Sequence, residues 1–130
     1  MQYVADTNTF LAVGLNEPER PWLVEATKDC HLLAPTVLPF EIGNALSALV
    51  KRKTLQVDQV QGVWDALARI PVELIEFDVR AGLLLAARNG IYAYDGYFLQ
   101  CAMDRRCPLL TLDQRMKQIA VSLGIEVVEQ

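Results

Sequence analysis

The chain begins Met1-Gln-Tyr-Val-Ala-Asp-Thr-Asn8, and the predicted fold is built around this segment. Its apolar run, residues 3–5, leads directly into Asp6, and a second apolar run begins at Phe10. A short run without polar alternation is typical of a strand buried on both faces, as at the centre of a parallel sheet. We therefore expect a central strand that ends at Asp6, with Asn8 as the N-cap of the next helix. Asp6 would lie at the carboxyl end of that strand, where open α/β sheets bind ligands, unless it only shapes the turn.

The rest of the chain repeats this alternation of strands and helices. Further strands are expected at residues 31–34, 71–77, 108–111 and 125–128, and helices at 9–15, 22–28, 36–51, 59–69, 79–88 and 95–103. A last helix is expected between a capping box at Thr111–Gln114 and Gly124. Because there is no repeat, low-complexity tract or linker, the pattern predicts one α/β domain over residues 1–130, with a parallel sheet flanked by helices.

Composition restricts the classes of protein that fit. A net charge of −4 argues against a protein that coats nucleic acid, but not against a nuclease, whose clustered acids lower the net charge. No apolar run approaches the ~18 residues of a membrane span and there is no signal-peptide pattern, so we expect no membrane association. The three cysteines lack metal-ligand spacing and are expected to be reduced thiols of a cytoplasmic protein.

Four acidic residues share one position in the predicted fold, because each follows a strand or begins a helix. Such points gather on one rim of a doubly wound sheet. Gathered carboxylates repel one another and need a cation or shifted pKa values, and Mg²⁺ or Mn²⁺ suits oxygen ligands. Either ion would lower the pKa of a bound water and stabilise charge on a phosphorus under attack. Helix capping is the alternative for each acid taken singly. The four acids are Asp6, Glu41, Asp95 and Asp113.

The segments around these acids resemble the PIN-domain ribonucleases, and in particular the VapC-type toxins of toxin–antitoxin pairs. They agree with that family in order, in spacing and in overall chain length. One departure is Gly96, where the family commonly has alanine or another small residue; glycine there weakens the start of the helix that carries Asp95. The segments are Val4-Ala-Asp6-Thr-Asn8, Pro39-Phe-Glu41-Ile-Gly-Asn-Ala-Leu46, Tyr94-Asp95-Gly-Tyr-Phe-Leu-Gln-Cys-Ala102 and Leu109-Leu-Thr-Leu-Asp113.

The resemblance implies a single PIN-like domain with a five-stranded parallel sheet in the order 3-2-1-4-5. It implies a Mg²⁺- or Mn²⁺-dependent endoribonuclease that hydrolyses RNA phosphodiesters with a metal-activated water, a VapB-like antitoxin as partner, and a homodimer. Asp6 and Asp95 would be the principal metal ligands, and Asn8 and Thr111 would orient the acids or water. The full catalytic and metal-binding set would be Asp6, Glu41, Asp95 and Asp113.

Other readings of the same residues stay open. Arg115 is a candidate for contact with an RNA phosphate, although basic residues at helix ends are often only solvated. The tyrosines at 92, 94 and 97 could stack on bases or pack at the rim of the core. A catalytically weak PIN-like scaffold is the second function, and a phosphoaspartate enzyme or receiver domain the third. A dehalogenase-type phosphatase would need an acid where Asn8 stands.

Overall fold

Strands and helices alternate along the chain in the computed structural model, which describes residues 1–129. Every predicted strand up to β4 and every predicted helix up to α6 begins and ends within two residues of its expected bounds. The elements are β1 (Gln2–Ala5), α1 (Thr7–Gly14), α2 (Arg20–Thr27), β2 (His31–Pro35), α3 (Leu38–Lys51), α4 (Val57–Ala68), β3 (Glu73–Ile75), α5 (Val79–Asn89), α6 (Ala93–Arg105), β4 (Leu109–Leu110) and α7 (Gln114–Ser122).

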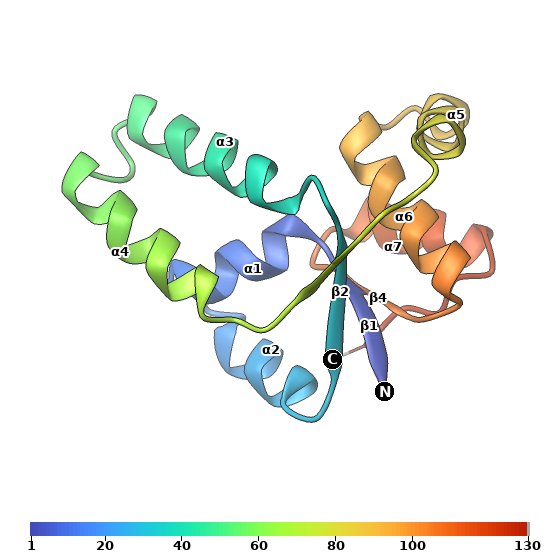
Figure 1. The fold of residues 1–130 in the computed structure, drawn as a ribbon, viewed down its shortest axis with the longest axis horizontal. Coiled ribbons are helices and arrows are strands. Elements are labelled where there is room, and N and C mark those ends of the chain that lie inside the picture. The colour runs from blue at the N-terminus through green and yellow to red at the C-terminus, as the bar shows by residue number, and fades with distance from the viewer. Residues whose placement is uncertain (130) are drawn as a thin grey trace.

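The sheet is parallel, with the strand order β3-β2-β1-β4. As predicted, β1 is an inner strand: Val4 pairs with Leu33 of β2 on one side and with Leu109 of β4 on the other, and all three side chains are fully buried. Helices α1 to α4 cover one face of the sheet and α5 to α7 cover the other (Figure 1). The chain is therefore an α/β sandwich of the expected class.

The predicted fifth strand, residues 125–128, is reduced to a single bridge. Val127 pairs in parallel with Leu109, and the main chain on either side of that bridge makes two hydrogen bonds, from Leu109 N to Glu126 O (2.8 Å) and from Val128 N to Leu109 O (3.0 Å). Because β4 is only two residues long, it offers little ladder for a partner to extend. The segment lies next to β4, where the order 3-2-1-4-5 places it, but forms no strand.

The first helix begins two residues earlier than expected. Asp6, and not Asn8, is the N-cap of α1, because Oδ1 of Asp6 accepts a hydrogen bond from the backbone N–H of Thr9 (3.1 Å). Asn8 lies inside the first turn and its side chain is exposed. The expectation that Asn8 caps this helix is therefore wrong: the strand ends directly at Asp6, which leaves no residue between strand and cap.

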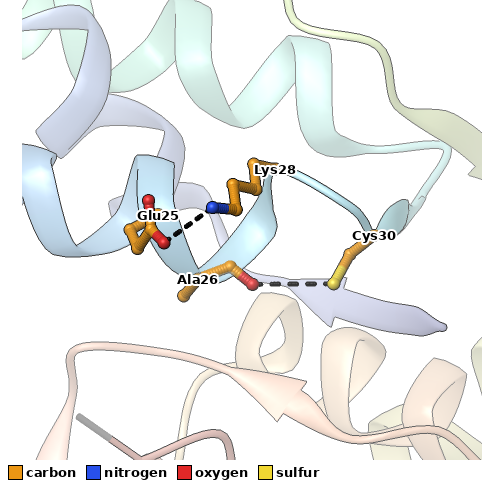
Figure 2. Close-up of polar contacts among 4 residues, drawn as sticks. All are labelled: Glu25, Ala26, Lys28 and Cys30. Carbon is orange, nitrogen blue, oxygen red and sulfur yellow. Dashed lines mark hydrogen bonds and ion pairs between the residues drawn. The ribbon is translucent and has the colours of Figure 1, made fainter.

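The turn from α2 into β2 carries the one half-buried cysteine. Figure 2 shows Cys30 Sγ donating to the carbonyl oxygen of Ala26 (3.5 Å), and Lys28 Nζ paired with Oε1 of Glu25 (2.8 Å). The other two thiols are buried, and all three cysteines are free, as the sequence predicts. None of the helices within residues 1–129 combines the length and the apolar character that crossing a bilayer requires.

Helices α5 and α6 approach closely at a pair of glycines. A Cβ placed on Gly96 would lie 2.4 Å from the carbonyl oxygen of Gly82 and 2.8 Å from Cβ of Ala86. Both distances are far below van der Waals contact, and the first involves main chain that cannot rotate away. Gly96 is thus a packing residue, whatever its effect on the start of the helix.

The Gly96→Ala variant should therefore lower the free energy of unfolding by about 1 to 3 kcal/mol, although alanine favours helix by up to ~1 kcal/mol. Gly62→Ala in α4 is the matched control, since a Cβ there meets nothing within 4 Å. That control should be stabilising by up to ~1 kcal/mol. Urea denaturation measures both. A Gly96→Ala protein as stable as the wild type would show that the two helices do not pack as closely as described.

Candidate metal centre

The topology brings the ends of β1 and β4 together. After β1 the chain winds through α1 to α4 on one face, and only later returns through α5 and α6 to place β4 on the other side of β1. Ligands bind at such switch points in open α/β sheets, beyond the carboxyl ends of the strands. Asp6 follows β1 and Thr111 follows β4, and the Asp6 N–H donates to Leu110 O (3.2 Å).

Asp6 is the most buried of the four predicted acids, with 6% of its surface exposed. Its Oδ2 accepts a hydrogen bond from Oγ1 of Thr111, and its Oδ1 accepts from Thr9 N. Burial raises the pKa of Asp6 to about 7, against the lowering effect of those two hydrogen bonds, and the charges of Asp95 and Asp113 raise it further. Asp6 is thus held in place by the protein and is poised to release its proton near neutral pH.

Glu41 reaches the same region from the first turn of α3. It is half-buried, and its Oε1 accepts a hydrogen bond from Oγ1 of Thr7, the first residue of α1. Burial raises the pKa of Glu41; the Thr7 hydroxyl opposes this shift and the charge of Asp95 adds to it. Glu41 therefore lies within electrostatic reach of Asp95, on the opposite face of the sheet.

Asp95 and Asp113 complete the cluster from the helices on the other face. Asp95 is half-buried in the first turn of α6, and burial followed by the charge of Asp113 raises its pKa. Within residues 1–129 its carboxylate accepts no hydrogen bond, so both oxygens are free to bind a ligand. Asp113 is the N-cap of α7, where Oδ1 accepts from the N–H groups of Arg115 (2.8 Å) and Met116 (3.2 Å).

The predicted capping box at Thr111 is wrong, because Asp113 and not Thr111 is the N-cap of α7. Thr111 lies before the helix, and its fully buried hydroxyl donates to Asp6 while accepting from Asp113 N (3.1 Å). The hydroxyl therefore couples two of the four acids instead of capping α7. This arrangement supports the prediction that Thr111 orients an acid of the cluster.

The four carboxylates suit a hard divalent cation. Each of the three acids with a raised pKa owes part of the shift to the charge of another member of the set: Asp6 to Asp95 and Asp113, Glu41 to Asp95, and Asp95 to Asp113. Carboxylate oxygens are the ligands that Mg²⁺ and Mn²⁺ prefer. No three Asp, Glu, His or Cys side chains among residues 1–129 already converge tightly enough to coordinate one ion. Rotation of side chains toward a shared cation would be needed, and that cation would relieve their repulsion.

The side chains of the two remaining predicted residues, Asn8 and Arg115, make no hydrogen bond with the four acids within residues 1–129. Asn8 is exposed and lines a surface groove together with Asp113, at the edge of the cluster. The Arg115 guanidinium donates through one Nη2 to the carbonyl oxygens of Asn89 (3.1 Å) and Gly90 (3.3 Å), where it satisfies the end of α5. The structure shows Arg115 capping the end of α5. Its contact with an RNA phosphate remains a prediction.

Thr7 is the residue that the sequence did not reveal. It is buried, with 6% of its surface exposed, and its hydroxyl contacts Glu41 across 34 positions of sequence. No spacing rule relates two residues so far apart. The only available signal was its place directly after Asp6, which an ordinary helix start explains equally well.

Comparison with known proteins identifies the family. The sequence model of the PIN domain matches residues 3–122, and the chain therefore belongs to the PIN domain family. No curated protein sequence matches it significantly.

Three solved structures have a similar fold, all at low sequence identity. PAE2754 from Pyrobaculum aerophilum is 18% identical with a TM-score of 0.68, over 92% of this chain and 79% of that one. VapBC2 from Rickettsia felis, solved bound to a DNA fragment from their promoter, is 17% identical with a TM-score of 0.68, over 98% of both chains. FitAcB from Neisseria gonorrhoeae is 20% identical with a TM-score of 0.55, over 98% of this chain and 96% of that one.

Proposed function

We propose that this PIN-domain protein is a Mg²⁺- or Mn²⁺-dependent endoribonuclease. The proposal is supported by the positions of Asp6, Glu41, Asp95 and Asp113 at the starts of helices or the end of β1, and by the pKa values of Asp6, Glu41 and Asp95, which burial and the charges of other members of the set raise. Such a cluster is costly to maintain unless a cation binds there. The full acidic set favours an enzyme over a scaffold that has lost its site.

The chain's own residues divide the work in the proposed mechanism. Asp6 and Asp95 would be the principal ligands, with Glu41 and Asp113 completing the set. A divalent ion held by these residues would supply an activated water and stabilise charge on the phosphodiester under attack. Thr111 and the Thr9 N–H fix the Asp6 carboxylate from two sides, so that its orientation does not depend on the ion. The carboxylate of Asp113 is exposed, so an ion or a substrate could reach it from solvent.

Incubation of the purified protein with total RNA in Mg²⁺, in Mn²⁺ and in EDTA tests this function. We expect discrete RNA fragments with either ion and none in EDTA. The same amount of single-stranded DNA, incubated in parallel, is the substrate control. Fragmentation that persists in EDTA would point to another nuclease in the preparation. A folded protein that cuts nothing under any condition would favour the scaffold reading.

The biological setting belongs to the same proposal. Two of the solved structures are of VapBC2 and FitAcB, which share this fold with the chain. We infer that the chain is the toxin of a VapBC-type pair, acting in the cytoplasm as a homodimer until a VapB-like antitoxin binds it. Expression of the chain alone should arrest growth, and co-expression with the antitoxin should restore it. Growth unaffected by an active, soluble enzyme would contradict the toxin role while leaving the nuclease standing.

A further inference from the structure

Thr7 adjoins one of the four acids in sequence, Asp6, and contacts another, Glu41. It is the first residue of α1, directly after Asp6, and its Oγ1 donates to Oε1 of Glu41 on α3. The hydroxyl is buried, and the first turn of α1 is already capped by Asp6, so this hydroxyl is not needed for the helix. Its contact is thus with an acid of the cluster and not with the backbone of its own helix.

Glu41 needs an external support more than the other three acids do. Asp6 and Asp113 are fixed by backbone N–H groups of the helices that they cap, and Asp95 has a short side chain. Glu41 has three rotatable side-chain bonds and does not cap its helix, since the N-cap of α3 is Val37. A flexible carboxylate must lose this freedom each time it binds an ion, and a support that fixes it beforehand removes that cost.

We propose that Thr7 is a positioning residue that holds Glu41 toward the other three acids, so that the cluster is ready to bind its cation. This inference rests on the proposed function of the site. Thr7 and Thr111 then have parallel roles, since one hydroxyl binds Glu41 and the other binds Asp6. Removing a partner that orients a metal ligand typically lowers metal affinity or activity by about 10- to 100-fold. We expect a loss of about that size when the Thr7 hydroxyl is removed.

The test compares Thr7→Val, which removes the hydroxyl at constant shape, with Thr7→Ser, which keeps it. Thr27→Val is the matched control, because the Thr27 hydroxyl donates to Leu23 O (2.7 Å) in α2, away from the acids. For each protein we would measure Mn²⁺ affinity, the rate of RNA cleavage and the urea midpoint. Thr7→Val should lose about 10-fold or more in both affinity and rate. Thr7→Ser and Thr27→Val should stay within about threefold of the wild type.

The Glu41→Ala background separates positioning from general stability. If Thr7 acts through Glu41, adding Thr7→Val to Glu41→Ala should change affinity and rate by less than about twofold, since the two effects are then not additive. A full loss in that background would overturn the proposal. So would a Thr7→Val protein that binds and cleaves like the wild type, or a Thr7→Ser protein as impaired as Thr7→Val.

A second Thr7 variant and the result for the wild type complete the test. Should Thr7→Val fail to fold, Thr7→Ala provides the same loss of the hydroxyl with a smaller side chain, and the same losses are expected. A wild-type protein that neither binds Mn²⁺ nor cleaves RNA would overturn the proposed function together with the role of Thr7. If the wild type binds Mn²⁺ and cleaves RNA but Thr7→Val loses neither affinity nor rate, only the positioning role would be overturned.

Discussion

Replacement of Asp95 by asparagine is expected to lower the rate of RNA cleavage at least about 100-fold, which is more than the loss typical of outer-shell partners. Asp95 is a proposed principal ligand, and the substitution removes its charge while keeping its size. Its carboxylate accepts no hydrogen bond within residues 1–129, so the variant loses no contact that the fold needs. Relief of its repulsion with Asp113 should leave the protein at least as stable as the wild type.

Asp104→Asn is the matched control for this loss. Asp104 lies on the same helix as Asp95, and its replacement by asparagine removes the same charge. Its Oδ1 only accepts a hydrogen bond from Gln100 Nε2 (2.9 Å) on the exposed surface. Cleavage by Asp104→Asn should equal that of the wild type within about twofold, as for a surface residue outside the site. Equal activity in Asp95→Asn and the wild type would remove Asp95 from the site.

The metal-free protein is expected to lose stability as the pH rises toward neutrality, and Mg²⁺ is expected to restore it. The pKa of Asp6 is raised from 3.8 to about 7 in the folded chain, so the folded state holds this proton more tightly than the unfolded state. The contribution is complete below about pH 4 and is lost as the pH rises through 7. Between about pH 5 and about pH 8 the resulting loss of stability amounts to roughly 2 to 3 kcal/mol. The pKa values of Glu41 and Asp95 are raised in the same direction.

Urea denaturation in EDTA at the two pH values checks this expectation, with Asp6→Asn beside the wild type. Asparagine is also a good N-cap, so α1 should persist, while the pH dependence due to residue 6 should vanish. Added Mg²⁺ should stabilise the wild type at the higher pH but not Asp6→Asn. Asp78→Asn is the control, because Asp78 caps α5 (3.0 Å to Ala81 N) outside the cluster. A wild type that follows the same pH profile as Asp6→Asn would contradict the assigned protonation of Asp6.

Local sequence signals were enough to predict the fold where they agreed with one another. The buried run before Asp6 marked an inner strand, and Gly90, with a φ of 65°, ended α5 as its glycine indicated. The fifth strand failed because its existence depends on the length of β4, which lies elsewhere in the chain. The caps at Asn8 and Thr111 failed because a neighbouring aspartate in each case was better placed.

The candidate site was predicted only in part for a similar reason. Acids at element starts can be located from sequence, because strand and helix boundaries are local features. The contact of Thr7 with Glu41 depends on how α1 packs beside α3, and the close approach at Gly96 depends on how α5 packs against α6. Both are tertiary relations, and a single sequence carries no spacing from which to derive them.

Asp6, Glu41, Asp95 and Asp113 are proposed to bind a divalent cation together. The most direct test is a titration of the metal-free protein with Mn²⁺, followed by the loss of the electron paramagnetic resonance signal of free Mn²⁺. The wild type should bind Mn²⁺ saturably, with Mg²⁺ competing, and the Asp6→Asn/Asp95→Asn double variant should bind none above background. Equal binding by the folded double variant would place the cation elsewhere, and no binding by the wild type would contradict a metal centre at the end of β1.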